Sequence, residues 1–207
     1  WVLSLTGCLG MAGMNQHGVA LCVNNLASSD ARVGAAWSAV VRRALDQPSA
    51  VAARDALVAA PIGSGRHFLV ADAEQAFGVE VSGTRRAVVF SGSGSGSGER
   101  RTYVHTNHPL DPELAALARI DPGATTYDRF RFLAGRLEVR APASPGELWE
   151  LLGSEEGYPR SVSSNQATPE DPHGPATCGG LVMRPAARAI EACAGFTHRA
   201  RPERFTP

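Results

Sequence analysis

Lysine is absent from this 207-residue sequence, and all 20 of its basic residues are arginine. The absence excludes a Schiff-base lysine or a Ser–Lys catalytic pair within these residues. The basic residues are matched by 20 acidic residues, so the formal net charge is zero. A neutral chain lacks the basic surface that attracts nucleic acid or an anionic membrane. We therefore expect neither a nucleic-acid partner nor a membrane partner.

Cysteines are few, and long apolar runs are missing. The four cysteines, Cys8, Cys22, Cys178 and Cys193, form neither a CxxC pair nor a dense framework, which favours a reducing, cytoplasmic location. We expect the last three to lie in the core. No apolar run approaches the roughly 18 to 20 residues of a membrane span, and no signal-peptide layout is present. Nothing in the sequence indicates a cofactor, and the glycines at positions 7, 10 and 13 match no phosphate-binding motif.

The order of secondary-structure patterns predicts an α+β layered domain that spans residues 1–207. Strand patterns occur at residues 1–6, 19–26, 67–71, 76–81, 86–90, 101–106, 176–183 and 187–194, and helix patterns at 34–46, 48–60, 111 onward, 126–138 and 144–152. A serine–glycine run at residues 91–98 is expected to be a loose loop, either natural or engineered. The chain opens directly in a β-like run at Trp1, so we expect the natural protein to continue upstream.

One polar stretch stands out where the strand pattern at residues 101–106 gives way to a loop. Val104-His105-Thr106-Asn107-His108 places two histidines around an asparagine. The stretch has three interpretations: a hydrogen-bonded strand end, a metal site that uses His105, His108 and another ligand such as His67, or an Asn107 amide that donates to a developing oxyanion. Spacing alone does not choose among them.

Three segments together resemble the acyl-coenzyme A:6-aminopenicillanic acid acyltransferase family of N-terminal nucleophile hydrolases. They are Gly13-Met14-Asn15-Gln16-His17-Gly18-Val19-Ala20 with its continuation to Asn24-Asn25-Leu26, then Ala76-Phe77-Gly78-Val79-Glu80, and Val104 to His108. Glu155-Glu156-Gly157-Tyr158-Pro159, followed by Ser161, agrees as well. The resemblance implies a four-layer αββα fold with two stacked antiparallel sheets.

The resemblance also implies a mechanism and site residues. Members of this family cut themselves before a cysteine, whose freed α-amino group acts as the base and whose thiolate attacks an amide or thioester carbonyl. An ordinary α-amino group has a pKa near 8 and can accept a proton at neutral pH. Asn107 matches the asparagine that stabilises the oxyanion. A second asparagine after the first hairpin lines the site, where Asn24 fits best and Asn25 stays an alternative.

The sequence departs from the family pattern in two places. An arginine follows the Tyr-Pro segment in the family, whereas this chain has Ser161-Val162-Ser163-Ser164. No cysteine stands at the chain start, and Cys8 lies one strand too late to match the nucleophile. We therefore expect the nucleophile segment upstream of Trp1, as a part of the same protein that completes the site for a small acyl-amide or acyl-thioester substrate. The alternative is a non-catalytic binding module with the same fold.

Overall fold

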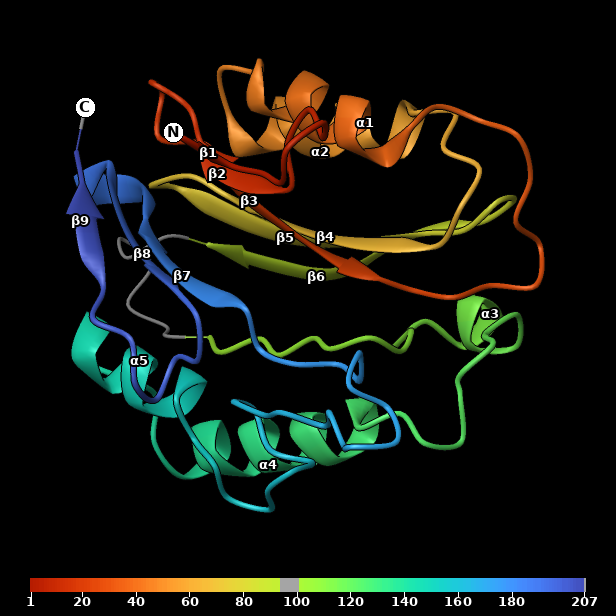
Figure 1. Cartoon of the computed structure of the whole chain (residues 1–207). Helices are drawn as coiled ribbons and strands as arrows, with labels where there is room; N and C mark the ends of the chain where they lie inside the picture. Colours follow the sequence, from red (N-terminus) through yellow and green to blue (C-terminus); the bar gives the residue numbers. More distant parts are fainter. Residues whose placement is uncertain (94–100, 207) are drawn as a thin grey trace. The chain divides into compact units, whose positions relative to one another are not determined.

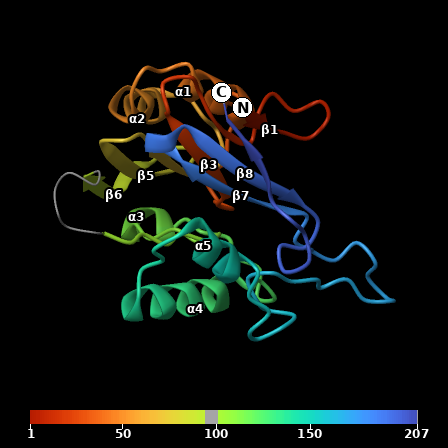
Figure 2. The same ribbon diagram turned by 90° about the vertical axis from the view of Figure 1, so that its left-hand side faces the viewer.

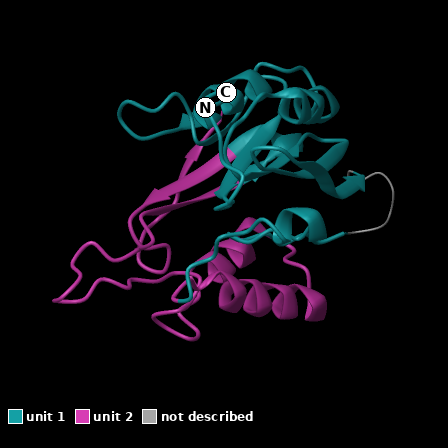
Figure 3. Ribbon diagram, turned by 90° about the vertical axis from the view of Figure 1, so that its right-hand side faces the viewer, with its two compact units in different colours: residues 1–122, 183–189, 207 teal, residues 123–182, 190–206 magenta. Residues whose placement is uncertain are grey.

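The computed structural model describes residues 1–93 and 101–206, which form two compact units (Figure 3). Unit 1 contains Trp1–Pro122 and Met183–Ala189, and unit 2 contains Gly123–Val182 and Ile190–Thr206. The single domain over residues 1–207 stays a prediction. No helix among these described residues is both long and apolar enough to cross a membrane.

Unit 1 is built on a six-stranded sheet in which every neighbouring pair is antiparallel (Figure 1). In chain and spatial order its strands are β1 (Val2–Leu3), β2 (Ala12–Met14), β3 (Ala20–Asn25), β4 (Arg66–Ala71), β5 (Gln75–Val81) and β6 (Arg86–Ser93). The last three residues of β6 belong to the serine–glycine run, so the predicted loop is wrong for residues 91–93. Residues 94–98 of that run lie outside the described residues.

Strand β2 falls in the glycine-containing stretch that the sequence pattern indicates as a loop. Gly13 pairs with Val2, and a Cβ atom at Gly13 would lie 2.3 Å from the Trp1 carbonyl oxygen. The absence of a side chain therefore lets β1 approach, which a propensity argument against glycine in strands does not anticipate.

Two helices cover one face of this sheet, as Figure 1 and Figure 2 both show. They are α1 (Trp37–Leu45) and α2 (Ala50–Ala59), close to the predicted ranges. The Ser49 hydroxyl caps α2 by accepting a hydrogen bond from the Ala52 amide. The core between helices and sheet includes Val41, Leu57 and Phe68, all of which are fully buried. Burying each such side chain stabilises the fold by about 1.5–3 kcal/mol.

The other face of the sheet carries a polar row. Strand register places Asn24 opposite His67, and His67 opposite Glu80, so the three side chains share one face across β3, β4 and β5. Residues 101–106 cross this face without forming the strand that the sequence pattern predicts (Figure 1). The prediction fails because side-chain contacts from Tyr103 and His105, rather than a strand ladder, attach this segment to the sheet.

The remaining elements are short. Helix α3 (Pro112–Ala115) follows Asp111, where the predicted helix pattern begins, and the Asp111 carboxylate accepts from the amides of Glu113 and Leu114. Helix α4 (Thr126–Val139) and helix α5 (Pro145–Leu152) belong to unit 2. Strands β7 (Gly179–Arg184), β8 (Ala189–Ala194) and β9 (Glu203–Phe205) form a three-stranded sheet, with the 3₁₀ turn Pro185–Ala187 between the first two. The two sheets and their helices confirm the predicted α+β class.

Candidate functional site

The two asparagines that the sequence predicts for the site lie at the same end of β3. The Asn107 side-chain amide donates a hydrogen bond to the backbone carbonyl of Asn25, with an N···O distance of 3.2 Å. Asn24 is the preceding residue and points to the polar face, whereas the Asn25 side chain is exposed and accepts from Arg66. The fold thus brings Asn107 to the residue next to Asn24.

A buried ion pair fixes the segment that carries Asn107. The His105 ring donates to Glu80 Oε1 at 2.7 Å through Nε2 and to the Thr106 carbonyl at 2.7 Å through Nδ1. Because both partners are acceptors, both ring nitrogens carry protons and His105 is an imidazolium ion. Glu80 also accepts from the backbone amides of Leu110 and Asp111, so it is a carboxylate. Both side chains of this pair are almost fully buried.

His67 lies flat against this pair and is neutral. Its ring stacks on the His105 ring with a centroid distance of 3.5 Å and an interplanar angle of 2°. Burial and, secondarily, the charge of His105 hold the pKa of His67 well below its ordinary value. His67 Nδ1 lies 2.9 Å from Asn24 Oδ1, and its Nε2 lies 3.1 Å from the Tyr103 hydroxyl. A neutral ring therefore links Asn24 to Tyr103.

Tyr103 packs against the sheet because the residue of β5 that faces its hydroxyl is a glycine, Gly78. A Cβ atom at Gly78 would lie 2.8 Å from the Tyr103 hydroxyl oxygen, and β5 shifts register beside this glycine. The Tyr103 ring also stacks on Phe90 of β6 at a centroid distance of 4.5 Å. Burial, together with the Glu80 charge, raises the pKa of Tyr103, so the hydroxyl keeps its proton.

These hydrogen bonds leave His67 and His105 no ring nitrogen for a metal ion. Each of the four nitrogens already faces a protein group, and His108 Nδ1 lies 3.1 Å from the Thr106 hydroxyl. Within residues 1–93 and 101–206, no three His, Cys, Asp or Glu side chains are placed to hold a metal. The geometry thus favours the hydrogen-bonding interpretations over the metal interpretation.

The cysteines differ in environment. Cys22 lies in β3, two residues before Asn24, and burial raises the pKa of its thiol to about 11. A hydrogen bond with the Gly10 backbone lowers the pKa of Cys8, which lies in the loop between β1 and β2. Cys178 is exposed just before β7, so its predicted core position is wrong. A strand-like pattern does not reveal that the ladder begins one residue later.

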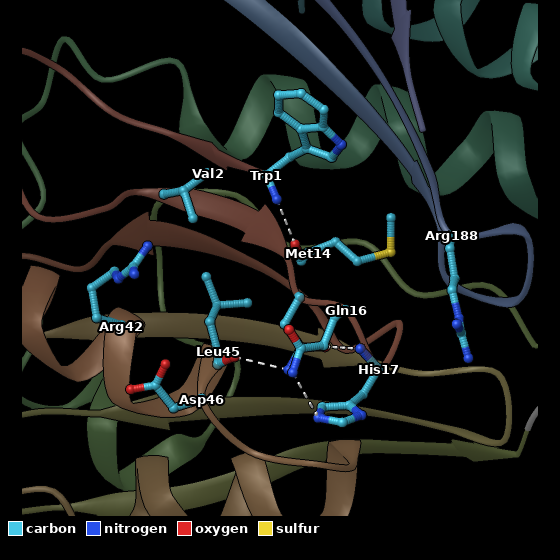
Figure 4. A pocket seen from close by; sticks show the side chains of 10 residues that line it. Trp1, Val2, Met14, Gln16, His17, Arg42, Leu45, Asp46 and Arg188 are labelled. Carbon is cyan, nitrogen blue, oxygen red and sulfur yellow. Dashed lines mark hydrogen bonds between the residues drawn. The ribbon is translucent and has the colours of Figure 1, made fainter. Parts of the chain in front are cut away.

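Unit 1 also contains a cavity of about 420 Å³, which is lined by other residues than the polar row (Figure 4). Its walls include Trp1, Met14, His17, Arg42 and Arg188, and neither Asn24 nor Asn107 is among its lining residues. Arg42 and Arg188 are both exposed, as most arginines in folded proteins are. We therefore place the candidate site at the asparagines rather than at this cavity.

Glu80 and His67, two members of the polar row, hold contacts that the sequence does not predict. The sequence places Glu80 within a family motif and offers His67 as an optional metal ligand, but it assigns neither residue these contacts. A charged residue between two valines, in Val79-Glu80-Val81, is the available signal, because a strand buried on both faces rarely accepts an unpaired carboxylate. Its partner His105 follows from tertiary structure alone.

An α+β fold of two antiparallel sheets that holds asparagine amides beside a buried histidine–glutamate pair is suited to carbonyl chemistry, in which negative charge develops on oxygen. Comparison with known families agrees. Residues 2–169 match the model of the acyl-coenzyme A:6-aminopenicillanic acid acyl-transferase family, and the chain belongs to that family. A search of curated proteins finds no match. The match confirms the resemblance seen in the sequence motifs and supports an acyl-transfer or hydrolase role in general.

Proposed function

We propose that this chain is the main part of an N-terminal-nucleophile cysteine enzyme, an amidohydrolase or acyltransferase that acts on a small acyl-amide or acyl-thioester. The nucleophile is a cysteine upstream of Trp1, which self-cleavage exposes as a new chain start. Asn107 stabilises the oxyanion and Asn24 lines the site. The cysteine usage of the chain supports a cytoplasmic location.

The observation that carries the proposal is the anchored amide of Asn107. Its hydrogen bond to the Asn25 carbonyl orients the side-chain nitrogen, and the buried His105–Glu80 pair fixes the backbone two residues earlier. An oxyanion donor is effective when it is held in place before charge develops, because no reorganisation is then needed during the reaction. A merely solvent-exposed asparagine would lack such anchoring.

The proposed reaction proceeds in balanced steps. The free α-amino group takes the thiol proton, and the thiolate adds to the substrate carbonyl while Asn107 donates to the new oxyanion. The C–N or C–S bond then breaks, the leaving group takes the proton, and an acyl-enzyme remains. Water or an amine attacks this acyl-enzyme through the same steps in reverse order and restores the thiol.

The cysteines of the described chain fit the nucleophile role poorly. Burial raises the pKa of Cys22 to about 11, which disfavours the thiolate at neutral pH. Cys8 lies in the loop after β1, where its thiol contacts the Gly10 carbonyl, and Cys178 and Cys193 belong to unit 2. These environments support a nucleophile from outside Trp1–Pro207.

A second candidate function is a binding module with the same fold. It is favoured by the run Ser161-Val162-Ser163-Ser164, which stands where the family pattern has an arginine. In this run the Ser161 hydroxyl donates to the Ser163 carbonyl, and the Ser163 hydroxyl lies 2.8 Å from His198 Nδ1. The Ser161 and Ser163 hydroxyls are therefore both engaged by groups of unit 2. A module of this kind would bind an acyl compound without turning it over.

Replacing Asn107 by alanine tests the proposal. The complete, processed protein is given an acyl-coenzyme A thioester, with and without 6-aminopenicillanic acid as the acceptor amine, and release of free thiol is followed. We expect the Asn107→Ala variant to lose about 10²–10³ in kcat, as enzymes do when one oxyanion donor is removed. Comparing the two mixtures separates hydrolysis from acyl transfer.

Asn165→Ala serves as the matched control, because Asn165 lies in unit 2 and its side-chain oxygen accepts from the nearby Ala167 amide. We expect this control to keep its kcat. An Asn107→Ala enzyme with unchanged kcat would remove the oxyanion assignment. An unmutated protein that binds the thioester but never releases thiol would favour the binding module.

A further inference from the structure

The hydrogen bonds around His67 form an ordered chain whose direction follows from counting protons. His105 holds two protons, since both of its ring nitrogens face acceptors. A second cation stacked at 3.5 Å on this imidazolium would be strongly repelled, so His67 carries only one proton. This single proton of His67 lies on either Nδ1 or Nε2.

The hydrogen-bond partners of His67 determine which of its ring nitrogens carries the proton. Asn24 Oδ1, at 2.9 Å from Nδ1, is a carbonyl-type oxygen that can only accept, so Nδ1 carries the proton. Nε2 then has a lone pair and accepts from the Tyr103 hydroxyl at 3.1 Å. The order of donation is therefore Tyr103 to His67 to Asn24.

This order determines what Asn24 can offer to a ligand. Its oxygen is engaged by His67, and its amide nitrogen has no hydrogen-bond partner within the part of the chain that the structure describes. Asn24 is half-buried, whereas His67 is almost fully buried behind it. The group left for a ligand is the N–H pair, which recognises an oxygen acceptor.

We propose that Tyr103 and His67 are positioning residues that fix the Asn24 amide with its N–H groups available, so that Asn24 donates to a carbonyl or oxyanion oxygen of the acyl substrate. This inference rests on the proposed function, because it assumes that Asn24 lines the site of acyl transfer. It goes further in giving Asn24 a donor role and in naming the two residues that set its orientation.

The surroundings of Tyr103 suit a fixed donor. Gly78 leaves room for its ring against β5, and Phe90 stacks on the ring from β6. The hydroxyl thereby reaches His67 from a rigid position. Its loss would free His67 to exchange its proton between the two nitrogens and would free the Asn24 amide to rotate.

The first test is the ¹⁵N spectrum of the histidine rings in the complete, processed protein, with the His67 signals assigned from a His67→Gln variant. We expect a neutral His67 with a proton on Nδ1 and none on Nε2. In Tyr103→Phe, which keeps the ring and removes the hydroxyl, we expect the His67 signals to move toward a mixture of both tautomers.

The second test is turnover of the acyl-coenzyme A thioester. Tyr103→Phe is expected to lower kcat about five- to tenfold, the effect of one neutral hydrogen bond that acts through a neighbour. Tyr127→Phe is the control, because Tyr127 lies on α4 in unit 2 and is 49% exposed. We expect the control to change neither kcat nor the His67 signals.

Failure of the inference is distinguishable from failure of the proposed function. A His67 protonated on Nε2, or an unchanged kcat in Tyr103→Phe, overturns the positioning chain even if Asn107→Ala is inactive. A fully active Asn107→Ala enzyme overturns the oxyanion assignment even if His67 carries its proton on Nδ1. Should Tyr103→Phe fail to fold, the tautomer of the unmutated protein still decides the direction of the chain.

Discussion

At the scale of single residues, Glu80 ties two parts of unit 1 together. Its carboxylate accepts from the His105 ring and from two consecutive backbone amides, those of Leu110 and Asp111. Three donors offset much of the cost of burying the charge. The segment that carries Asn107 is therefore held on both sides of that residue, at His105 and at Leu110.

Replacing Glu80 by glutamine is expected to lower the free energy of unfolding by about 3–5 kcal/mol, because it leaves the His105 imidazolium buried without a counter-charge. Urea unfolding of the two proteins at pH 7 measures the difference. Glu74→Gln is the control, since Glu74 is an exposed residue of the β4–β5 turn and its change should stay within about 0.5 kcal/mol. A Glu80→Gln protein as stable as the parent would contradict the ion pair.

From the sequence alone, the two asparagines can be proposed as site residues, but the histidines that contact them or hold their segment in place cannot. Asn107 and Asn24 can be proposed because they lie in motifs of the family. The pairing of Asn24 with His67 depends on strand register, which short-range patterns do not encode here. His105 stacks on His67 from a segment 38 positions away in the sequence, and only the tertiary fold reveals that contact.

At the scale of elements, the turn between β5 and β6 is fastened by Asp30 from the loop after β3. The carboxylate accepts from the hydroxyls of Ser82 and Thr84, at 2.7 and 2.6 Å, and from the Thr84 amide at 2.8 Å. Partial burial opposes ionisation, but these hydrogen bonds outweigh it and hold the pKa of Asp30 well below its ordinary range.

The lowered pKa sets the sign of a pH dependence. The folded state binds the Asp30 proton less readily than the unfolded state, so this stabilisation is present above the unfolded pKa of about 3.9 and is lost as pH falls below it. We expect Asp30→Asn to cost about 1–2 kcal/mol at pH 7, allowing for solvent screening of a partly exposed group.

Thermal unfolding of both proteins between pH 7 and pH 3 measures this effect. The difference between parent and Asp30→Asn should shrink below about pH 4, because the unfolded parent takes up a proton there that the folded parent does not bind. Asp55→Asn, on the outer side of α2, is the control and should leave the curve nearly unchanged. A constant difference across the whole range would show that Asp30 acts through packing rather than through its charge.

Elements with local signals were predictable, and elements that depend on distant partners were not. The caps at Ser49, Asp111 and Ser144 lie where the helix patterns begin, and each accepts from backbone amides. The sequence pattern does not predict strands β2 and β9, since a glycine-containing segment and an arginine-rich tail become strands only when a neighbour pairs with them.

At the scale of the whole molecule, the family assignment says more about function than any single helix or strand does. The chain could be placed from three short motifs, and the family match over residues 2–169 confirms that placement. Composition and periodicity alone reach only the α+β class. These motifs contain Asn24, Asn25 and Asn107, and the fold brings Asn107 to the Asn25 carbonyl at the end of β3.

We propose that the complete protein processes itself to expose a catalytic cysteine. Intact mass, combined with sequencing of the chain start, tests it on protein expressed from the full reading frame. We predict a fragment that begins with cysteine upstream of Trp1. An unprocessed chain with no cysteine in the upstream segment would contradict the claim, and Asn107 would then be a hydrogen-bonding residue of a binding module.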